Sequence, residues 1–543
     1  MKKNLLVSLM SLLCVAFMMP NVASASTINA AMTASSESVN NVSYAKVIPG
    51  STLVVAKIEM DNLLDKSDVR NNTIVRAMFE QKIAQAPENI KNLLRNIFAN
   101  PNNSGLNVNA PAYLALINVE KEQFILTFAM GNLNAFENTL MAITEGQLSK
   151  YENNGMTIIN TGDQKVSLAY DSEKFIVVLD KVWADLLYYI QLSPENLAIN
   201  NKKFAAVFNS ALDVKLAFNF DAFLQMMIQQ GKIGYDMLPI VAMVKEYAMY
   251  ASLDFENGLV NLKADINVEE EYKAFANQLI RKPVRRHFDY IPANSFAVLS
   301  YNFDLNQIYP ILASTGVLNT LASKGINEET ARLMLAALSG DYTAAAWIEG
   351  GNINNVQFML AIDCADRSLF DLLVSYLIYE EGATMVDSDV YALNVNKEKV
   401  YNSVTYEYDV VTKGNDYFVV YKNNAIMVVP DNYYYKMNVN GDFRPLANNV
   451  RNNAVFTSME NNLVVDVKPI RESALNNIRN RGFAPDADER TAIEMLNMVN
   501  SITADFNIYS LDVVLNTSNK NINSLKLIVD KLISIAIQNS NLK

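Results

Sequence analysis

The chain has 543 residues, of which 50% are hydrophobic, and its formal net charge is −12. A chain this acidic disfavours nucleic acid as a partner, because affinity for a phosphate backbone requires a basic face. Its single histidine, His287, excludes a metal site built from several imidazoles, and it excludes Ser-His-Asp or Cys-His catalysis unless His287 itself serves.

The first residues predict an export signal. Two lysines precede the apolar stretch 5–19, and Ala23-Ser24-Ala25 has the small side chains that signal peptidase requires, so we expect residues 1–25 to be removed between Ala25 and Ser26. A membrane anchor is the alternative, but the stretch is shorter than the roughly 20 residues that cross a bilayer core. The periplasm is the expected location, and association with the outer membrane is the alternative.

Cys14 lies inside the apolar stretch and raises the question of lipidation. The large Leu13 precedes it and Ser11 stands three positions before it, which does not match the usual lipidation pattern. Removal of the signal leaves Cys364 as the one cysteine of the mature chain, so we expect no internal disulfide. The apolar run around Cys364 predicts a buried core thiol.

Residues 26–45 are rich in Ser, Ala, Asn and Thr and predict a flexible tether. An internal repeat follows. Ile48-Pro49 precedes an apolar run at 52–58, and Ile291-Pro292, 243 residues later, precedes a similar run at 296–301. A repeat of this length indicates a duplicated domain rather than a solenoid.

In the first half, apolar periodicity and turn residues predict alternating groups of strands and helices. The expected strands are 53–58, 112–119, 123–130, 157–159, 166–170, 175–179, 214–218, 251–255 and 260–266. The expected helices are 72–84, 88–98, 135–144, 182–190, 222–250 and 269–280.

The second half repeats this order. The expected strands are 296–301, 342–349, 356–363, 463–467, 503–508 and 512–516, with a longer tyrosine-rich β-meander at 384–436. The expected helices are 305–312, 316–322, 328–338, 368–379, 470–502 and 522–537. We therefore predict an α+β fold with two similar halves, 46–282 and 291–543, joined by a basic linker at 283–290. Each half should contain largely antiparallel sheets with helices on one face.

The opening blocks of the two halves carry a family resemblance. With Ile48-Pro49, Asp61, Ile291-Pro292 and Asp304-Leu305, the chain resembles an uncharacterised exported family of Bacteroides-type bacteria that is classed as a domain of unknown function. The resemblance covers about residues 46–540 and implies no reaction, cofactor or catalytic residue. Many members of that family look like envelope lipoproteins, and the sequence around Cys14 departs from that pattern.

The tyrosine-rich meander is the best candidate for a binding surface. Tyr406 and Tyr408 alternate along an expected strand and should share a face, as should Tyr433 and Tyr435. Tyrosine suits interfaces and stacking on sugars, although it also favours half-buried strand faces for structural reasons.

Other clusters give weaker signals. The basic stretch 281–287 predicts a solvated linker that exposes His287, with a docking site for an anionic group as the alternative. Asp486 to Glu489 are expected to cap a helix that begins near Arg490 rather than to bind Ca²⁺. We find no pattern for a catalytic residue, a metal site or a cofactor.

These observations favour a non-catalytic protein of the cell envelope that binds a protein or polymer. An envelope protein or a glycan is the expected partner, and no membrane span remains after signal removal. The alternatives are a secreted glycan hydrolase that uses two carboxylates, which leave no local pattern, and a carbohydrate-binding module that uses the tyrosine-rich meander. A pair of close, desolvated carboxylates in a cleft would identify the hydrolase.

Overall fold

The computed structural model describes residues 43–118, 123–144, 149–160, 166–179, 193–232, 247–314, 327–393, 397–402, 407–412, 417–435, 443–448, 462–482 and 484–540, with positions 318, 322 and 405. The expected signal peptide, its cleavage site at Ala25 and Ser26, and most of the tether lie outside these residues. The described chain divides into two compact units. Unit 1 contains Glu269–Asn516, and unit 2 contains the residues up to Val268 together with those from Thr517 onward.

Unit 2 is built on an antiparallel sheet whose strands are mostly joined by short connections. In spatial order the strands are β4 (Ser149–Asn153), β5 (Met156–Asn160), β6 (Val166–Tyr170), β7 (Lys174–Leu179), β3 (Gln123–Ala129), β2 (Ala112–Asn118), β1 (Val54–Ile58), β8 (Val214–Asn219), β9 (Ala248–Glu256) and β10 (Leu259–Ile266). The first strand of the chain therefore lies in the interior of the sheet, between β2 and β8.

Three of the described helices of unit 2 begin at a capping asparagine. The described helices of this unit are α2 (Met60–Ser67), α3 (Thr73–Ile83), α4 (Glu88–Ala99), α5 (Leu133–Ile143), α7 (Ala205–Phe208), α8 (Phe220–Gln229) and α19 (Ser524–Ser540). Asn72, Asn132 and Asn219 cap α3, α5 and α8, because their side-chain oxygens accept hydrogen bonds from backbone amides of the first turn.

The strands of unit 1 also pair antiparallel. In spatial order its strands are β15 (Thr384–Asp387), β16 (Val390–Leu393), β19 (Tyr417–Lys422), β20 (Ala425–Pro430), β14 (Val356–Asp363), β13 (Gly340–Ile348), β12 (Ala297–Phe303), β21 (Asn462–Asp466), β22 (Val499–Phe506) and β23 (Ser510–Thr517). The short β11 (Ile280–Arg281) also pairs with β12, and β17 (Lys397–Asn402) with β18 (Glu407–Thr412) forms a separate two-stranded sheet.

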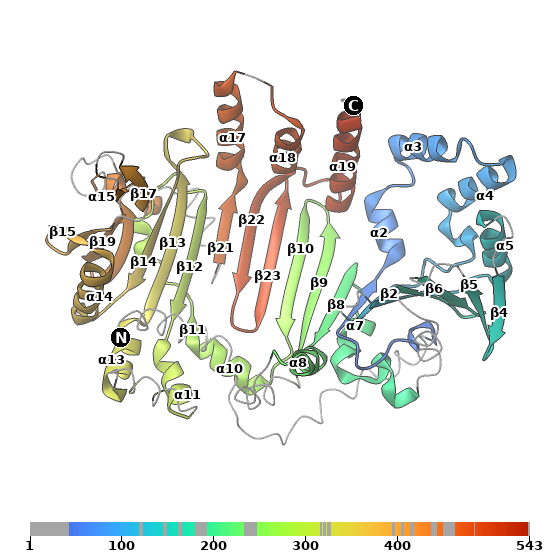
Figure 1. Ribbon diagram of the computed structural model, residues 1–543, viewed down its shortest axis with the longest axis horizontal. Helices are drawn as coiled ribbons and strands as arrows, with labels where there is room; N and C mark the ends of the chain where they lie inside the picture. Colours follow the sequence, from blue (N-terminus) through green and yellow to red (C-terminus); the bar gives the residue numbers. More distant parts are fainter. Residues whose placement is uncertain are drawn as a thin grey trace. The chain divides into compact units, whose positions relative to one another are not determined.

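The helices of unit 1 are α10 (Glu270–Leu279), α11 (Tyr309–Ser314), α13 (Glu328–Ala337), α14 (Arg367–Glu381), α15 (Asp431–Tyr435), α17 (Val467–Arg481) and α18 (Ala487–Met498) (Figure 1). The expected cap at 486–489 is confirmed. Asp486 and Glu489 form a capping box at the start of α18, so these acidic side chains satisfy backbone amides.

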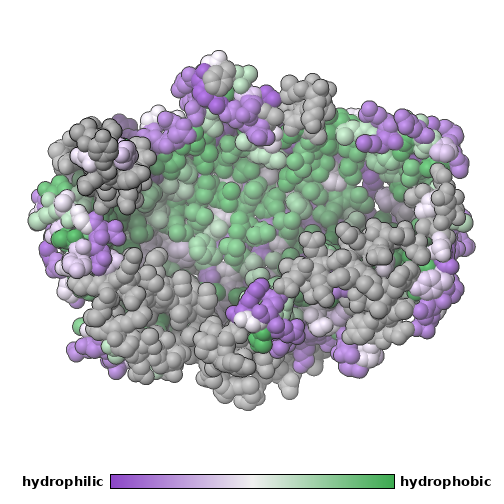
Figure 2. Space-filling model, in the orientation of Figure 1, coloured by the Kyte–Doolittle hydropathy of each residue, from purple (hydrophilic) through white to green (hydrophobic). Residues whose placement is uncertain are grey.

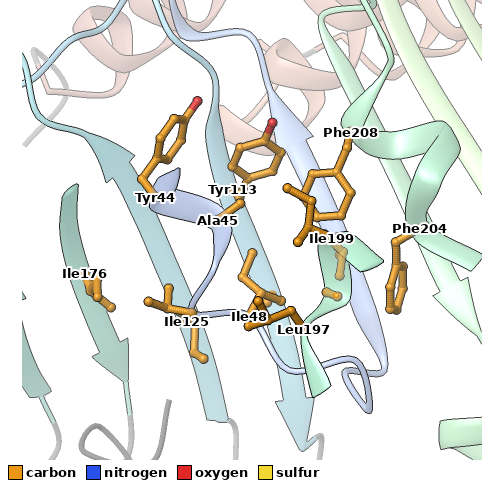
Figure 3. Close-up of a cluster of buried hydrophobic side chains, with 14 of the residues drawn as sticks. Tyr44, Ala45, Ile48, Tyr113, Ile125, Ile176, Leu197, Ile199, Phe204 and Phe208 are labelled. Carbon is orange, nitrogen blue, oxygen red and sulfur yellow. The ribbon is translucent and has the colours of Figure 1, made fainter. Parts of the chain in front are cut away.

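Each unit has its main hydrophobic core on one face of its sheet, which we call the covered face. In unit 2, Tyr113, Ile125 and Ile176 project from β2, β3 and β7 toward Ile48 and Leu197 of the flanking segments (Figure 3). In unit 1, Trp347, Met359 and Met427 from β13, β14 and β20 pack with Ile291 and Leu446. The Ile-Pro segment that opens each predicted half therefore helps to cover a sheet.

The α+β class with antiparallel pairing is confirmed, and the structure differs from the expected elements in several places. Residues 431–435 form α15 instead of continuing the meander as a strand, because the paired strand β20 ends at Pro430, which lacks a backbone donor. Of the helices expected across 222–250, the structure describes α8, which ends at Gln229; residues 233–246 lie outside the described residues, and β9 already begins at Ala248, before the expected end. The expected helix 182–190 lies outside the described residues.

The compact units and the predicted halves differ at their ends. The helix α10 follows the last strand of the first half, yet it belongs to unit 1, where Leu279 packs with Leu305, Ile308 and Leu312. The helix α19 follows the last strand of the second half, yet it belongs to unit 2, where it packs on α2. Each of these helices is thus stabilised by a partner that is distant in sequence.

Candidate functional site

The open face of each sheet, opposite the covered face, is the most unusual surface of the protein. Along β3 the side chains alternate strictly: Ile125 is fully buried on the covered face, whereas Phe124 and Leu126 are only half-buried on the open face. The strand β13 shows the same alternation, with Trp347 buried and Ala346 half-buried. Apolar side chains therefore occupy both faces, and one face remains accessible to solvent.

In unit 1 the open face has a low floor between taller side chains. Ala297 on β12 lies opposite Ala346 on β13, and Ala344 lies opposite Leu299. On one side Phe358, opposite Ala346, is 50% exposed. The open face of unit 1 is made by Ala297, Leu299, Ala344, Ala346, Val356, Phe358, Leu360, Leu463, Val465 and Ile502. Small residues between large ones create a shallow trough.

Unit 2 carries an open face of similar composition. Its members project from six neighbouring strands, and the strand registers place them side by side in rows across the sheet. They are Val54, Ile58, Leu114, Leu116, Phe124, Leu126, Val214, Leu216, Phe218, Met249, Ala251, Leu253, Val260, Leu262, Ala264 and Ile266. Leu262 is 40% exposed.

None of the residues that we assign to the two open faces is charged or polar. Figure 2 shows hydrophobic residues gathered over the strands that are turned to the viewer in Figure 1, with hydrophilic residues at the rim. The backbone N–H and C=O groups of these strands are hydrogen-bonded within the sheet. The side chains named above are apolar and have no donor or acceptor of their own. Contiguous apolar patches of this kind on a protein surface mark binding sites.

The described helices that pack on the open faces lie over a part of each face. In unit 1, Phe370 and Val374 of α14 pack over Val419 and Ile426, so the face is closed over β19 and β20. In unit 2, Phe136 of α5 packs against Phe175 of β7. The open face is therefore bounded on one side by α14 in unit 1 and by α5 in unit 2.

The predicted tyrosine surface is placed differently from the expectation. Tyr406 lies outside the described residues, and Tyr408 lies in β18 opposite Tyr401. Tyr433 and Tyr435 belong to the short helix α15 and not to a strand, so the period-two argument for a shared face does not apply to them.

Tyr433 is a core residue that borders a pocket. It is 4% exposed, its ring centroid lies 5.0 Å from that of Trp347, and its hydroxyl donates to the carbonyl of Tyr290. Burial raises the pKa of Tyr433. A pocket of about 480 Å³ is lined by Trp347, Tyr433, Phe443 and Arg444, but both Trp347 and Tyr433 use their ring faces for packing.

The expectation that His287 is exposed in a solvated linker is wrong. His287 is 1% exposed, and its Nε2 atom lies 3.2 Å from the Asp363 carboxylate and 3.2 Å from the Asp341 carbonyl oxygen. Two buried carboxylates hold this segment in place. Asp363 lies beside the His287 ring, and Asp341 accepts hydrogen bonds from the backbone amides of Val284 and Arg286. The basic stretch is thus a structural strap of unit 1.

The cations of this strap are matched by carboxylates. Arg281 pairs with Asp304, and the Arg286 Nε atom lies 3.4 Å from Asp363. Although burial opposes it, the hydrogen bond from His287 and the nearby charges lower the pKa of Asp363. A pocket of about 450 Å³ adjoins Arg281, Lys282 and Arg286, and the two arginines already pair with Asp304 and Asp363, which reduces what an anion would gain there.

In unit 2, two carboxylates share one cation. The Lys66 Nζ atom lies 2.7 Å from Asp213 and 2.8 Å from Asp254. Burial raises the pKa of Asp213, whereas the hydrogen bonds from Lys66 and Asp213 bring the pKa of Asp254 below its ordinary value despite partial burial. The Asp213 side chain is 0% exposed and cannot contact a substrate, so this cluster joins α2 to the sheet.

The prediction of a buried thiol at Cys364 is confirmed. Cys364 is fully buried, and burial raises the pKa of its thiol, which makes it a poor nucleophile. Within the described parts of the chain, no three His, Cys, Asp or Glu residues are placed to hold a metal ion. In the same parts, no helix combines the length and hydrophobicity that a bilayer crossing needs.

Sequence reasoning missed the open faces, although a signal existed. A strand with one solvated face should alternate between apolar and polar residues. The runs 112–117, 124–128 and 356–362 instead carry apolar residues at most positions of both faces. That pattern predicts strands that are packed on both faces of the sheet. Among the described residues, the side chains of the covered face are buried, whereas most of those on the open face are half-buried.

The chain is similar to one family model and to a few solved structures. The model described as "Domain of unknown function (DUF4836)" matches residues 44–521. No curated protein matches the chain. Crystal forms I and III of TP0453 are each 12% identical with a TM-score of 0.23; form I covers 43% of this chain and 82% of that chain, and form III covers 44% and 88%. Similarity at this level supports no functional argument.

Proposed function

This chain belongs to the family of the domain of unknown function DUF4836, and we propose that it is a non-catalytic, exported protein of the cell envelope that binds hydrocarbon chains of lipids. The observation that carries the proposal is the open face of unit 1, where Phe358 and Val356 are 50% and 45% exposed beside the floor of Ala297, Ala344 and Ala346. The periplasm or the inner side of the outer membrane is the proposed location.

A hydrocarbon chain fits the open faces better than a peptide or a sugar does. Each buried methylene contributes about 0.8 kcal/mol, and it requires no hydrogen bond from the protein. A peptide in extended form or a glycan would instead leave its polar groups without partners on a face of Ala, Leu, Val and Phe, which costs about 1–3 kcal/mol for each group. The occupant that matches this chemistry is an acyl chain.

We further propose that the two halves arose by duplication, so that the protein offers two related binding faces. Supporting this, β4-β5-β6-β7-β3-β2-β1-β8-β9-β10 in unit 2 corresponds strand by strand to β15-β16-β19-β20-β14-β13-β12-β21-β22-β23 in unit 1. The positions of Ile48-Pro49 and Ile291-Pro292 at the start of each half agree with this proposal.

The alternatives from the sequence receive less support. A carboxylate-dependent hydrolase needs accessible acid and base groups, and the buried Asp213 with its Lys66 partner does not supply them. A carbohydrate-binding module needs an exposed aromatic platform, whereas Tyr433 is 4% exposed.

The proposal is tested by titrating the mature chain with a naturally fluorescent polyene fatty acid, whose emission rises in apolar surroundings. We expect saturable binding that oleic acid competes away. The variant Ala346→Glu places a charge in the trough and should weaken binding at least about tenfold, which is about 1.4 kcal/mol. The matched control Ala492→Glu changes an exposed alanine of α18 and should bind normally. Equal binding by both variants, or no saturable signal, would contradict the proposal.

A further inference from the structure

The helices α3 and α4 of unit 2 form a hairpin that is held together at two points. The rings of Phe79 and Phe98 stack with centroids 4.5 Å apart. Arg95 donates to both carboxylate oxygens of Glu80, at 2.9 Å from Nε and 2.7 Å from Nη2. These contacts define the hairpin without burying most of its apolar side chains.

Part of the apolar surface of this hairpin faces solvent. Ile74 and Met78 lie one turn apart on the same side of α3 and are 41% and 44% exposed. The five large apolar side chains of α4 are half-buried: Ile90, Leu93, Leu94, Ile97 and Phe98. Isolated exposed apolar residues are common, but two adjacent amphipathic helices with such faces indicate a partner.

The hairpin also differs from the rest of the chain in charge. Residues 73–99 contain the basic residues Arg76, Lys82, Lys91 and Arg95 and the acidic residues Glu80 and Glu88, a net charge of +2 in a chain of net charge −12. A surface that is locally basic on an acidic protein is attracted to an anionic partner, while the remainder of the molecule is repelled.

We propose that the α3–α4 hairpin binds in the interfacial region of a lipid bilayer that carries anionic headgroups. Amphipathic helices of this kind lie in the plane of the interface, with apolar side chains among the upper acyl segments and lysine and arginine at the headgroups. Ile74 and Met78 are the residues that enter the bilayer, and Arg76 and Lys91 contribute to the charge that attracts it. This inference builds on the proposed function, because a bilayer is the source of the hydrocarbon chains.

A bilayer fits these observations better than a protein partner does. A protein partner that complements a basic rim needs acidic groups at fixed positions, whereas anionic headgroups are mobile and adapt to scattered cations. Closure of the hairpin over the open face of its own unit is the other arrangement that would bury Ile74 and Met78, and it gives a different result in the experiment below.

The experiment is a flotation assay of the full mature chain with vesicles of phosphatidylglycerol and phosphatidylcholine in equal parts, or of phosphatidylcholine alone. We expect binding to the anionic vesicles only, and weaker binding at high salt. The variant Met78→Glu should bind at least about fivefold less. The matched control Leu333→Glu changes a leucine of α13 that is 56% exposed outside the hairpin, and it should bind like the unmodified chain.

Titration with the fluorescent fatty acid in the absence of vesicles separates this inference from the proposed function. Met78→Glu should leave that titration unchanged. Absence of flotation, or equal losses in Met78→Glu and Leu333→Glu, would overturn the bilayer contact even if the fatty acid binds. Loss of fatty acid binding in Met78→Glu with unchanged flotation would also overturn it, because the hairpin would then be a cover for the open face.

Discussion

The Asn72 side chain donates a 2.7 Å hydrogen bond to the Asp530 carboxylate, although the two residues are 458 positions apart in the chain. A second contact of the same kind joins the Lys526 Nζ atom to Asp68 at 2.9 Å. Both pairs attach the C-terminal helix α19 to the segment around the end of α2 and the start of α3. The last helix of the protein is therefore a structural part of unit 2, which contains the first strand.

Removal of residues 517–543 should destabilise unit 2 selectively. The helix α19 packs on α2, β9 and β10, and its loss would expose their apolar side chains to water. Hydrogen exchange should show faster exchange in α2 and β9, while β12, β13 and β14 of unit 1 keep their protection. Uniform loss of protection in both units, or none, would show that α19 does not have this specific role.

The ion pair between Asp68 and Lys526 should make the anchoring of α19 depend on pH. The hydrogen bond from Lys526 lowers the pKa of Asp68, and the same bond raises the pKa of Lys526. A carboxyl with a lowered folded pKa stabilises the protein above its unfolded pKa near 3.9, and this contribution is lost as the pH falls through the folded value. The Asp68 side chain is 35% exposed, so solvent screens the pair and the contribution is small, about 0.2–1 kcal/mol.

The variant Asp68→Asn tests this pair, because asparagine also accepts the positive φ of 51° at this position. Denaturant midpoints should differ between the variant and the unmodified chain at pH 7 and converge at pH 3. High salt should reduce the difference at pH 7. A difference that persists unchanged at pH 3 would exclude the ion pair as its cause.

The cluster of Lys66, Asp213 and Asp254 should be a strong structural contact. Lys66→Met leaves two carboxylates near each other without their cation, one of them fully buried, and we expect a loss of about 2–4 kcal/mol at pH 7. Acidification should reduce this loss, because protonation removes the charges that lack a partner. In the control Lys91→Met, an exposed pair with Glu88 at 3.5 Å is lost, and chemical denaturation should detect less than about 0.5 kcal/mol.

Gly340, at the start of β13, should tolerate no side chain. Its φ is +142°, and a Cβ atom would lie 2.2 Å from the Asp363 carboxylate, which also receives the hydrogen bond from the Asp341 amide. Gly340→Ala should cost about 3 kcal/mol or more, since it disturbs the strap around His287. Gly350 also has a positive φ, +62°, but nothing lies within 4 Å, so Gly350→Ala should cost about 1 kcal/mol. Similar urea midpoints for the two variants would contradict this account.

Local features of the chain could be predicted from the sequence. The capping box of Asp486 and Glu489 was recognisable because both partners lie within one helical turn. Strands such as β3 and β14 were recognisable from short apolar runs, and the antiparallel class followed from the short connections between them. These predictions depend on residues that are neighbours in sequence.

The features that depend on distant contacts could not be predicted. The sequence around Asp68 does not indicate that Lys526 will pair with it, so the sequence could not predict that α19 belongs to unit 2. His287 was misplaced because its partners Asp341 and Asp363 are remote in sequence. The open face was missed for the same reason, because alternation along one strand does not show which face the rest of the chain will cover.

Native mass spectrometry of the mature chain, purified without detergent from the cell envelope that produces it, tests lipid binding most directly. The account predicts a bound species whose added mass equals one or more lipids in the unmodified chain and in Ala492→Glu, and its loss in Ala346→Glu. Only the bare mass of the chain in all three proteins, or equal amounts of lipid in all three, would contradict the central claim that the open sheet face holds hydrocarbon chains.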